Sequence, residues 1–293
     1  MNTVNRLDIV DTQAHIGPGQ IEETLSAMNA LGIRGLVIDE CWLQNISNFD
    51  PHETLDGGII RPICPTAEEA SEKYPDRFAW VLRVNRLDPE FPKQICKVRD
   101  SQGGKAIRLV PGMDPREVQA FANGEYDRLL DEVSDSGLPL FLYLPDQPEL
   151  IAERAKKFPD LRIVVDHCGL FNNAMRAMNP NAKFLSGEEQ LALYDRVLHL
   201  AELPNVGLKW AHYSTMFQCP AWRGEELWPI LRKTIDAFGA GRIMWASDFS
   251  VNQSGDTWGA LLYSLLGNAD LTEDERTAIL GGTAQKYLDW IQA

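Results

Sequence analysis

Leu7-Asp8-Ile9-Val10-Asp11-Thr12-Gln13-Ala14-His15 is an apolar run that ends in a cluster of polar residues. The apolar part predicts the first β-strand of the chain. Residues just past the carboxyl end of a parallel strand are where α/β barrels carry their chemistry. Gln13 and His15 stand on alternate residues, so both side chains point to the same face of the strand. The stretch therefore predicts a buried strand that delivers an amide and an imidazole to one site.

The same strand-then-helix rhythm repeats along the chain. Expected strands lie at about 7–16, 35–40, 78–84, 106–110, 138–144, 162–167, 205–210 and 242–248. Expected helices include 21–32, one starting near 66, 148–158, 191–203 and a last helical segment at about 272–291. Near-continuous apolar runs suit strands that are buried on both faces of a parallel sheet. Eight of them alternating with helices predict an α/β protein with a (β/α)8 TIM barrel, formed by a single domain over 1–293.

The alternative architecture is an open, doubly wound parallel sheet. That fold needs a ligand site at its switch point, such as a phosphate-binding Gly-x-Gly-x-x-Gly loop after the first strand. Gly17-Pro18-Gly19 is too short for this motif and contains proline. The two longest interruptions, about 42–65 and 170–190, follow the second and sixth strands. In a barrel these long loops lie at the carboxyl, catalytic end.

Charge and composition exclude several classes of function. The net charge of −14 argues against nucleic acid and against an anionic membrane surface as partners, since both attract basic proteins. No segment approaches the roughly 18 apolar residues that span a bilayer, and residues 1–6 contain no apolar signal core. The five cysteines are scattered and odd in number, which is typical of reduced thiols. We expect a cytoplasmic protein with a small-molecule substrate, and we allow for a homo-oligomer.

His167 and Asp248 follow the sixth and eighth apolar runs and are the main candidates for chemistry. An imidazole beside Gly169 can approach a substrate or a metal closely, although a buried histidine satisfied by the backbone fits the same pattern. A carboxylate at a strand end is costly to bury without a partner or a task. Asp248 suits a general base, a metal ligand or a helix N-cap.

Several other strand ends carry polar groups that suit substrate binding. Arg108 interrupts the fourth apolar run and can grip a carboxylate, although an internal salt bridge with Asp39 or Glu40 is the alternative. The remaining candidates are Tyr143, Lys209 and His212, of which Lys209 and His212 are the weaker because either can point outward. Gly-x-Ser-x-Gly, P-loop and His-Glu-x-x-His motifs are absent from the sequence.

These pieces, in this order, resemble the amidohydrolase superfamily, in particular its amidohydrolase-related (amidohydrolase 2) family. The branch that it resembles contains 2-pyrone-4,6-dicarboxylate lactonase and fuconolactonase-like enzymes. The first strand looks like the family's Asp-x-His-x-His strand. Further segments that carry the resemblance are 158–169, 204–209, 241–249 and 278–284. The resemblance spans nearly the whole chain and implies the barrel fold.

The resemblance also implies roles for single residues. Asp248 would deprotonate the attacking water, His15 and His167 would polarise the substrate carbonyl, and Arg108 would hold a substrate carboxylate. Gln13 stands where the family has its first metal-binding histidine. The candidate ligands are then His15, His167 and Asp248, with Gln13 as a fourth. This set is weak for a tight zinc site, which usually has three or four good nitrogen, sulfur or carboxylate ligands. We therefore expect no required metal, with one divalent ion, zinc or manganese, on His15, His167 and Asp248 as the alternative.

The function expected from these observations is a catabolic hydrolase of the carboxylic ester type. It would open a lactone or a similar cyclic ester of a small carboxylated metabolite. Gln13, Arg108, Tyr143, Lys209 and His212 would bind this anionic substrate. The first alternative is a metal-dependent decarboxylase or hydratase of the same family. The second is a catalytically inactive barrel that binds a ligand.

Overall fold

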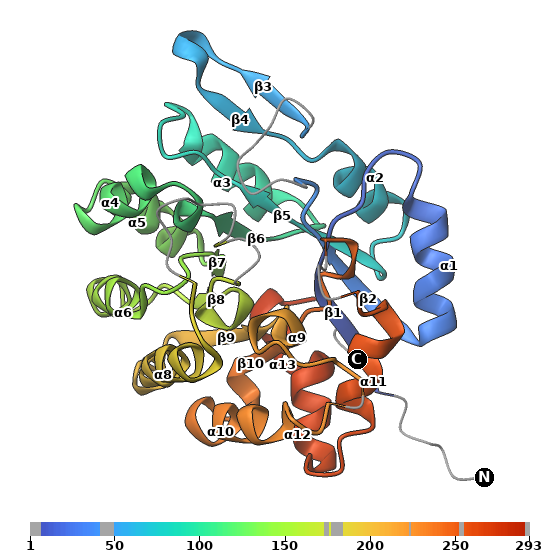
Figure 1. Cartoon of the computed structure of the whole chain (residues 1–293). Coiled ribbons are helices and arrows are strands. Elements are labelled where there is room, and N and C mark those ends of the chain that lie inside the picture. The colour runs from blue at the N-terminus through green and yellow to red at the C-terminus, as the bar shows by residue number, and fades with distance from the viewer. Residues whose placement is uncertain are drawn as a thin grey trace.

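A computed structural model describes residues 7–41, 50–172, 176, 184–222, 224–251 and 255–290. Its parallel sheet has eight strands in the order β1-β2-β5-β6-β7-β8-β9-β10 (Figure 1). They are β1 (Ile9–Ala14), β2 (Ile33–Ile38), β5 (Phe78–Arg83), β6 (Gly104–Leu109), β7 (Leu140–Leu142), β8 (Ile163–Val165), β9 (Val206–Trp210) and β10 (Ile243–Trp245). All eight runs predicted from the sequence are strands of this sheet, and the predicted (β/α)8 barrel is confirmed.

Helices surround the strands and cover their outer face (Figure 1). They are α1 (Ile21–Leu31), α2 (Pro65–Lys73), α3 (Phe91–Asp100), α4 (Pro115–Ala122), α5 (Asp127–Ser136), α6 (Pro148–Lys157), α8 (Gly187–Leu198), α9 (Tyr213–Met216), α10 (Trp228–Phe238), α11 (Trp258–Leu266), α12 (Glu273–Thr277) and α13 (Thr283–Leu288). Capping explains several of these boundaries. For example, Ser186 and Glu189 form a capping box that satisfies backbone donors at the start of α8.

The first and last strands close the barrel through side chains and irregular backbone bonds. Thr12 Oγ1 donates to the carbonyl of Trp245 at 2.7 Å, and the Ser247 amide donates to Asp11 Oδ1 at 2.9 Å. The Asp248 amide donates to the carbonyl of Gln13, also at 2.9 Å. The seam between β1 and β10 therefore runs directly through the residues that the sequence marks as chemical.

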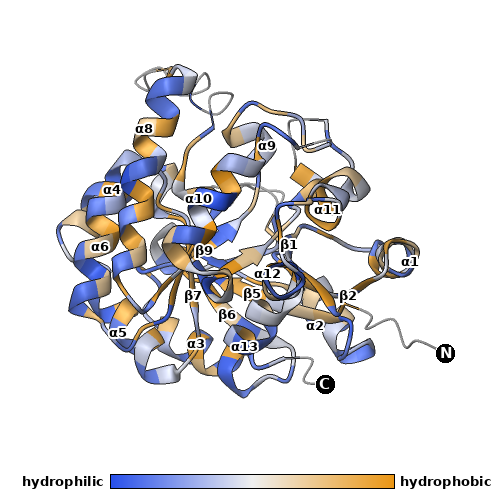
Figure 2. Cartoon of the chain, turned by 90° about the horizontal axis from the view of Figure 1, so that it is seen from below, coloured by the Kyte–Doolittle hydropathy of each residue, from blue (hydrophilic) through white to orange (hydrophobic). Residues whose placement is uncertain are grey.

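Two apolar layers hold the barrel together. Alternate strand residues, such as Val37, Val81 and Val164, form an inner cluster with the C-terminal residues Tyr287 and Trp290. The other strand residues pack outward against the helices in a larger core. Figure 2 shows α13 at one end of the barrel and α9 at the other. The C-terminal segment thus covers the amino end of the barrel. The carboxyl end lies on the opposite side, where the strand-end polar residues are.

The C-terminal helical segment differs from a single helix. It consists of α12, a π-helical stretch over Ala278–Gly282, and α13. A Cβ on Gly281 would lie 1.9 Å from the carbonyl oxygen of Asp8, so only glycine allows this helix to touch the chain entering β1. Residue 291 of the predicted segment lies outside the described residues.

The two long loops are partly described. After β2, an antiparallel hairpin of β3 (His52–Thr54) and β4 (Ile60–Pro62) stands out from the ring of helices (Figure 1). The sequence predicted a plain loop here. Gly57 and Gly58 both adopt positive φ at the turn of the hairpin. Residues 42–49 and most of 173–183 lie outside the described part of the chain.

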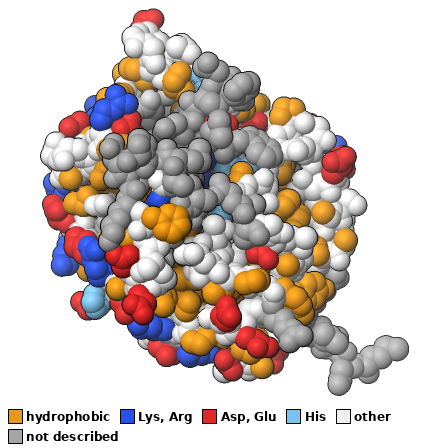
Figure 3. All heavy atoms as spheres, in the orientation of Figure 1, with side chains coloured by type: hydrophobic (Ala, Val, Ile, Leu, Met, Phe, Trp, Pro, Cys, Tyr) orange, Lys and Arg blue, Asp and Glu red, His pale blue; other side chains and the backbone are white. Residues whose placement is uncertain are grey.

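None of the described helices combines the length and the apolar composition that a bilayer crossing requires. Figure 3 shows Lys and Arg side chains beside Asp and Glu side chains around the rim of one face of the molecule. Ion pairs such as Arg116–Asp114 and Arg196–Glu149 have this interspersed character. Surface pairs of this kind contribute little stability, about 0–1 kcal/mol each.

Candidate active site

A layer of charged side chains lies on top of the apolar interior at the carboxyl end of the barrel. Inward-facing positions recur every second residue of a strand, so the residue two positions past an inward apolar side chain also faces inward. The pairs are Val37 and Asp39, Val81 and Arg83, Ala106 and Arg108, and Val164 and Asp166. The four charged members are all buried. The alternation of side chains along each strand therefore explains why these four charged side chains point into the barrel.

These buried charges form a continuous network across the barrel. Arg83 Nη2 lies 2.7 Å from Asp39 Oδ2, and Arg108 pairs with the same carboxylate. Arg108 Nε also donates to Asp166 Oδ2 at 2.8 Å, and Lys209 Nζ lies 2.7 Å from Asp166 Oδ1. Asp39 and Asp166 follow β2 and β8, whereas Arg108 lies on β6 and Lys209 on β9. Both contacts of Arg108 thus skip an intervening strand, which is possible for side chains in a barrel interior.

Burial and charge compete at each of these groups. Burial opposes ionisation of Asp39, but Arg83 and Arg108 outweigh it and hold the pKa of this carboxyl well below its usual range. Burial has the same effect at Asp166, where Lys209 and Arg108 outweigh it and lower the pKa. Burial lowers the pKa of Lys209, and the charge of Asp166 opposes that shift. Both carboxyls of the network are therefore ionised at neutral pH.

Asp248 is the centre of the polar site. Its Oδ2 accepts a hydrogen bond from Gln13 Nε2 at 2.9 Å and lies 2.8 Å from His212 Nε2. His167 Nε2 is 3.4 Å from the same oxygen, and His15 Nε2 is 3.1 Å from Oδ1. Only 1% of Asp248 is exposed. One buried carboxylate is thus surrounded by three imidazoles and one amide.

Electrostatics keep Asp248 charged and His167 neutral. Burial opposes ionisation of Asp248, but His15 and His212 outweigh it, and the pKa of this carboxyl lies well below its usual range. Burial, reinforced by the neighbouring His212, lowers the pKa of His167 well below its usual value. An ionised carboxylate beside a neutral imidazole is the protonation state that a metal ligand set needs.

Three of these residues share an unusual backbone conformation. His167, His212 and Asp248 have φ values of 52°, 52° and 47°, in the left-handed region. Such a conformation costs a non-glycine residue about 1–2 kcal/mol. Each residue stands just past the end of a barrel strand, and the left-handed turn departs from the strand's alternation of side chains. All three strands thus end in the same kind of turn, and the three side chains lie close together.

The same three residues form a cluster that can hold a metal ion. One ligand atom from each of His167, His212 and Asp248 lies within 4.8 Å of the others, and all three residues are buried. Within the described residues, the Nδ1 atoms of His167 and His212 have no hydrogen-bond partner. Two imidazoles and a carboxylate match a catalytic zinc site, which has three protein ligands and an open position. The residues present therefore fit a divalent ion.

All eight residues singled out from the sequence lie in this network. Tyr143 packs edge-on against the ring of His167, with 5.1 Å between ring centroids. Lys209 contacts Gln13, and His212 lies inside the barrel although its direction was left open. In the compact cluster His212 takes the place that the sequence gave to His15.

Arg108 makes the internal salt bridge that was its alternative interpretation. It pairs with Asp39, as that alternative named, and also with Asp166. Sequence reasoning missed Asp166 as a site residue. The signal that could have found it is the strand period, because it lies two positions after the inward residue Val164.

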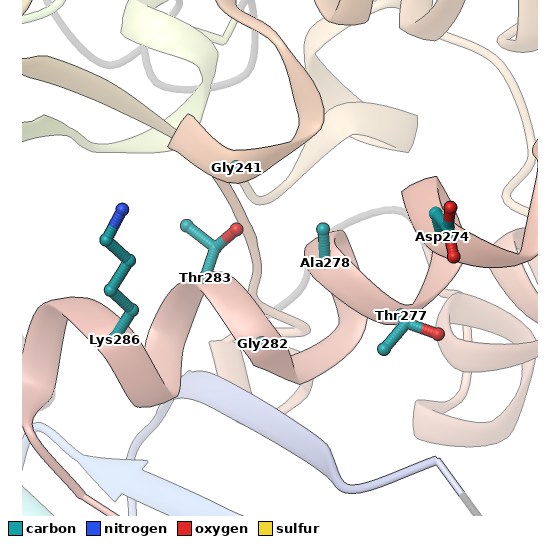
Figure 4. A pocket seen from close by; sticks show the side chains of 7 residues that line it. All are labelled: Gly241, Asp274, Thr277, Ala278, Gly282, Thr283 and Lys286. Carbon is teal, nitrogen blue, oxygen red and sulfur yellow. The ribbon is translucent and has the colours of Figure 1, made fainter. Parts of the chain in front are cut away.

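A surface hollow lies away from this network (Figure 4). It is open to the surface and is lined by Gly241, Asp274, Thr277, Ala278, Gly282, Thr283 and Lys286. These residues belong to the C-terminal segment and to the turn before β10, at the amino end of the barrel. Barrel enzymes carry their chemistry at the opposite end, so this hollow is not the candidate site.

Comparison with solved structures places the chain among barrel proteins. An amidohydrolase from Burkholderia multivorans with bound zinc has 16% identity and a TM-score of 0.72, over 96% of this chain and 99% of that one. A probable 2-pyrone-4,6-dicarboxylic acid hydrolase from Acinetobacter baumannii with citric acid bound has 14% identity and a TM-score of 0.65, over 97% and 100%. A 5-carboxyvanillate decarboxylase from Novosphingobium aromaticivorans, complexed with manganese and a nitrobenzoic acid derivative, has 15% identity and a TM-score of 0.60, over 96% of each chain.

The expectation that no metal is required is wrong. Two of these similar structures hold zinc or manganese, and this chain has a buried cluster of His167, His212 and Asp248 that can hold an ion. The expectation rested on the missing imidazole at Gln13. His212 supplies an imidazole from another strand, so the loss at position 13 leaves a complete donor set.

Sequence comparison completes the assignment. Among curated proteins, no relative matches the chain. The family model described as amidohydrolase matches residues 65–290, which is most of the chain. The chain therefore belongs to the amidohydrolase family.

Proposed function

We propose that this amidohydrolase opens a lactone or a similar cyclic ester of a small carboxylated molecule, with a divalent ion and Asp248 in its site. The observation that carries the proposal is the ionised, buried carboxylate of Asp248, which three imidazoles approach within 3.4 Å at the carboxyl end of the barrel. This carboxylate is ionised at neutral pH, so it can accept a proton from a water molecule whose acidity a divalent ion would raise.

His167, His212 and Asp248 are the residues that would hold the ion. The set with His15 in place of His212, suggested by the sequence, is the alternative. A divalent ion at such a site polarises a carbonyl and makes a water molecule more acidic.

The remaining steps of the reaction are assigned to side chains of the protein. Asp248 takes a proton from the attacking water as the new carbon–oxygen bond forms at the lactone carbonyl. His15 Nε2, which lies 3.1 Å from Asp248 Oδ1, is placed to donate to the developing oxyanion. The ring carbon–oxygen bond then breaks, and the proton held by Asp248 passes to the leaving oxygen. The product is the open-chain hydroxy acid, and atoms and charge balance.

The charge of the site favours an anionic substrate. Arg83, Arg108 and Lys209 balance Asp39, Asp166 and Asp248 one for one. A divalent ion adds two positive charges to this balanced set. One substrate carboxylate would offset one of these charges in a site of low dielectric constant, and a second carboxylate would restore neutrality. Arg108 already bonds two carboxylates, so the attraction comes from the whole site rather than from this one residue.

A matched panel of substrates tests the proposal. The zinc-loaded or manganese-loaded protein is assayed on lactones that carry a carboxylate and on the same lactones as methyl esters, and ring opening is followed by proton release. We expect turnover of the carboxylated series and loss of turnover in Asp248→Asn. Full activity of Asp248→Asn, or equal activity on both series, would contradict the proposal.

A second candidate is a metal-dependent decarboxylase or hydratase, and the metal-capable cluster favours it. That reaction would release carbon dioxide or add water across a double bond without opening a ring. Measuring carbon dioxide release from aromatic carboxylic acids separates it from hydrolysis. An inactive ligand-binding barrel is disfavoured, because His15, His167, Asp248 and Arg108 all remain within one network.

A further inference from the structure

We propose that Lys209 and Gln13 form a positioning pair that fixes the orientation of Asp248. The pair consists of the Lys209 ammonium, which donates to Gln13 Oε1 at 2.9 Å, and the Gln13 amide, whose Nε2 donates to Asp248 Oδ2 at 2.9 Å. This inference rests on the proposed function only in taking Asp248 as the proton acceptor. It assigns Lys209 and Gln13 a role different from the substrate binding expected from the sequence.

The chemistry of the two ends fixes the orientation of the Gln13 amide. An ammonium can only donate, and an ionised carboxylate can only accept. With the opposite orientation, the Gln13 oxygen would face the Asp248 carboxylate and its NH2 group would face Lys209. Two like pairs would then be buried without hydrogen bonds, and unsatisfied buried polar groups destabilise a fold. The charge of Lys209 thus determines that Gln13 presents a donor to Asp248.

Lys209 is itself held rigidly and away from solvent. Its side chain has no exposed surface, and its Nζ lies 2.7 Å from Asp166 Oδ1 and 3.8 Å from the ring centroid of Phe141. Asp166 is anchored in turn by Arg108. An ammonium enclosed by a carboxylate, an amide and an aromatic ring has no direction left for a substrate. Lys209 therefore acts through Gln13.

The pair distinguishes the two oxygens of Asp248. Oδ2 receives Gln13 Nε2 and faces His212 and His167. Oδ1 faces His15 Nε2 at 3.1 Å and is not contacted by the pair. Oδ1 is thus the oxygen that the pair leaves to take a proton. Without the Gln13 donor, the carboxylate would keep only its imidazole contacts, and its preference for this orientation would weaken.

A double-mutant cycle tests the inference. Lys209→Met keeps the length of the side chain but removes its charge, and Gln13→Leu removes both amide groups. Both single variants and the double variant are compared in two assays. One is the kcat and KM of the zinc-loaded protein on its best lactone. The other is the affinity of the metal-stripped protein for Zn²⁺, measured in competition with a chromophoric chelator.

The expected signature is non-additivity without a change in KM. Each single variant should lose about 10- to 100-fold in kcat and in zinc affinity, as is typical when a residue that orients a ligand is removed. The double variant should lose no more than the worse single variant, because both changes break the same chain of contacts. Lys105→Met, the same substitution at the far end of β6, is the matched control and should retain both properties.

Gln13→Leu and Gln13→Glu guard against simple misfolding. Both leave the pair of Lys209 with Asp166 intact. Gln13→Glu keeps the shape and the contact with Lys209 but presents an acceptor to Asp248, so it should lose activity like Gln13→Leu. Multiplying losses in the double variant, a raised KM with unchanged kcat, or an active Gln13→Leu protein would each overturn the inference.

The two assays separate this inference from the proposed function. Zinc affinity needs no substrate. A non-additive zinc cycle without turnover of any lactone would support the pair and count against the hydrolase. Lactone turnover with additive losses would support the hydrolase and overturn the pair.

Discussion

Arg108→Met separates a structural role of Arg108 from the substrate-binding role expected of it. Arg108 is the sole described partner shared by Asp39 and Asp166, and all three side chains are buried. At an effective dielectric constant near 20, each contact between opposite charges about 4 Å apart contributes about 4 kcal/mol before desolvation is counted. Arg83 and Lys209 remain to compensate the two carboxylates. Removing one partner from a buried ion network typically costs about 3–5 kcal/mol, and we expect a loss of this size.

The assay is urea unfolding followed by tryptophan fluorescence, with the metal removed so that binding does not mask the change. Arg116→Met is the matched control. Its side chain is 90% exposed and pairs with Asp114 at the surface, so we expect a change below about 1 kcal/mol. The refuting result is an Arg108→Met protein with the stability of the control and a selective rise in KM for carboxylated lactones. That outcome would mean that Arg108 is held for the substrate rather than for the network.

Three further predictions concern other parts of the molecule. Gly281→Ala should lose about 1–3 kcal/mol of unfolding free energy because its Cβ would meet the Asp8 carbonyl, whereas Gly282→Ala, whose nearest contact would be 3.4 Å, should be nearly neutral. Arg232 and the Thr272 amide lower the pKa of Glu275 to about 2, so its stabilising effect is complete above about pH 4.5 and is lost as the pH falls towards 2. The stability difference between the native protein and Glu275→Gln, measured by urea titrations across this range, should shrink accordingly; a constant difference would contradict the shift. Zinc at about 100 times its Kd should stabilise the metal-stripped protein by about 2.7 kcal/mol in the same titration, and Asp248→Asn should abolish most of this gain.

The fold was predictable because its signal is repeated along the chain. Each of the eight apolar runs fits a buried strand best. An error at the boundary of one run leaves the alternation of strands and helices intact. The hairpin over His52–Pro62 was missed because its strands are short and largely outside the core. Its turn signal, Gly57-Gly58, was present in the sequence but was assigned to a loop.

The membership of the polar site was predictable, whereas its geometry was not. Gln13, His15, Arg108 and Lys209 were named from their positions at strand ends, and all of them lie in the network. The set of metal-ligating residues was harder to predict from the sequence, because the direction of a side chain past the end of a strand depends on the local turn. His212 could be judged inward or outward from its position, and only the backbone decides.

Left-handed backbone at His167, His212 and Asp248 is what converts the barrel's strand ends into a metal-capable cluster. At about 1–2 kcal/mol per residue, the three conformations together oppose folding by several kcal/mol. A glycine at each position would adopt the same turn without this cost. Strain that recurs at three separate strand ends, and brings three ligand-type side chains within 4.8 Å, is hard to attribute to packing alone. The buried charge network lies immediately beside the cluster and holds one of its members through Gln13. Rigid support on one side and strained turns on the other therefore act on the same carboxylate, Asp248, and this convergence is the physical reason to place the chemistry there.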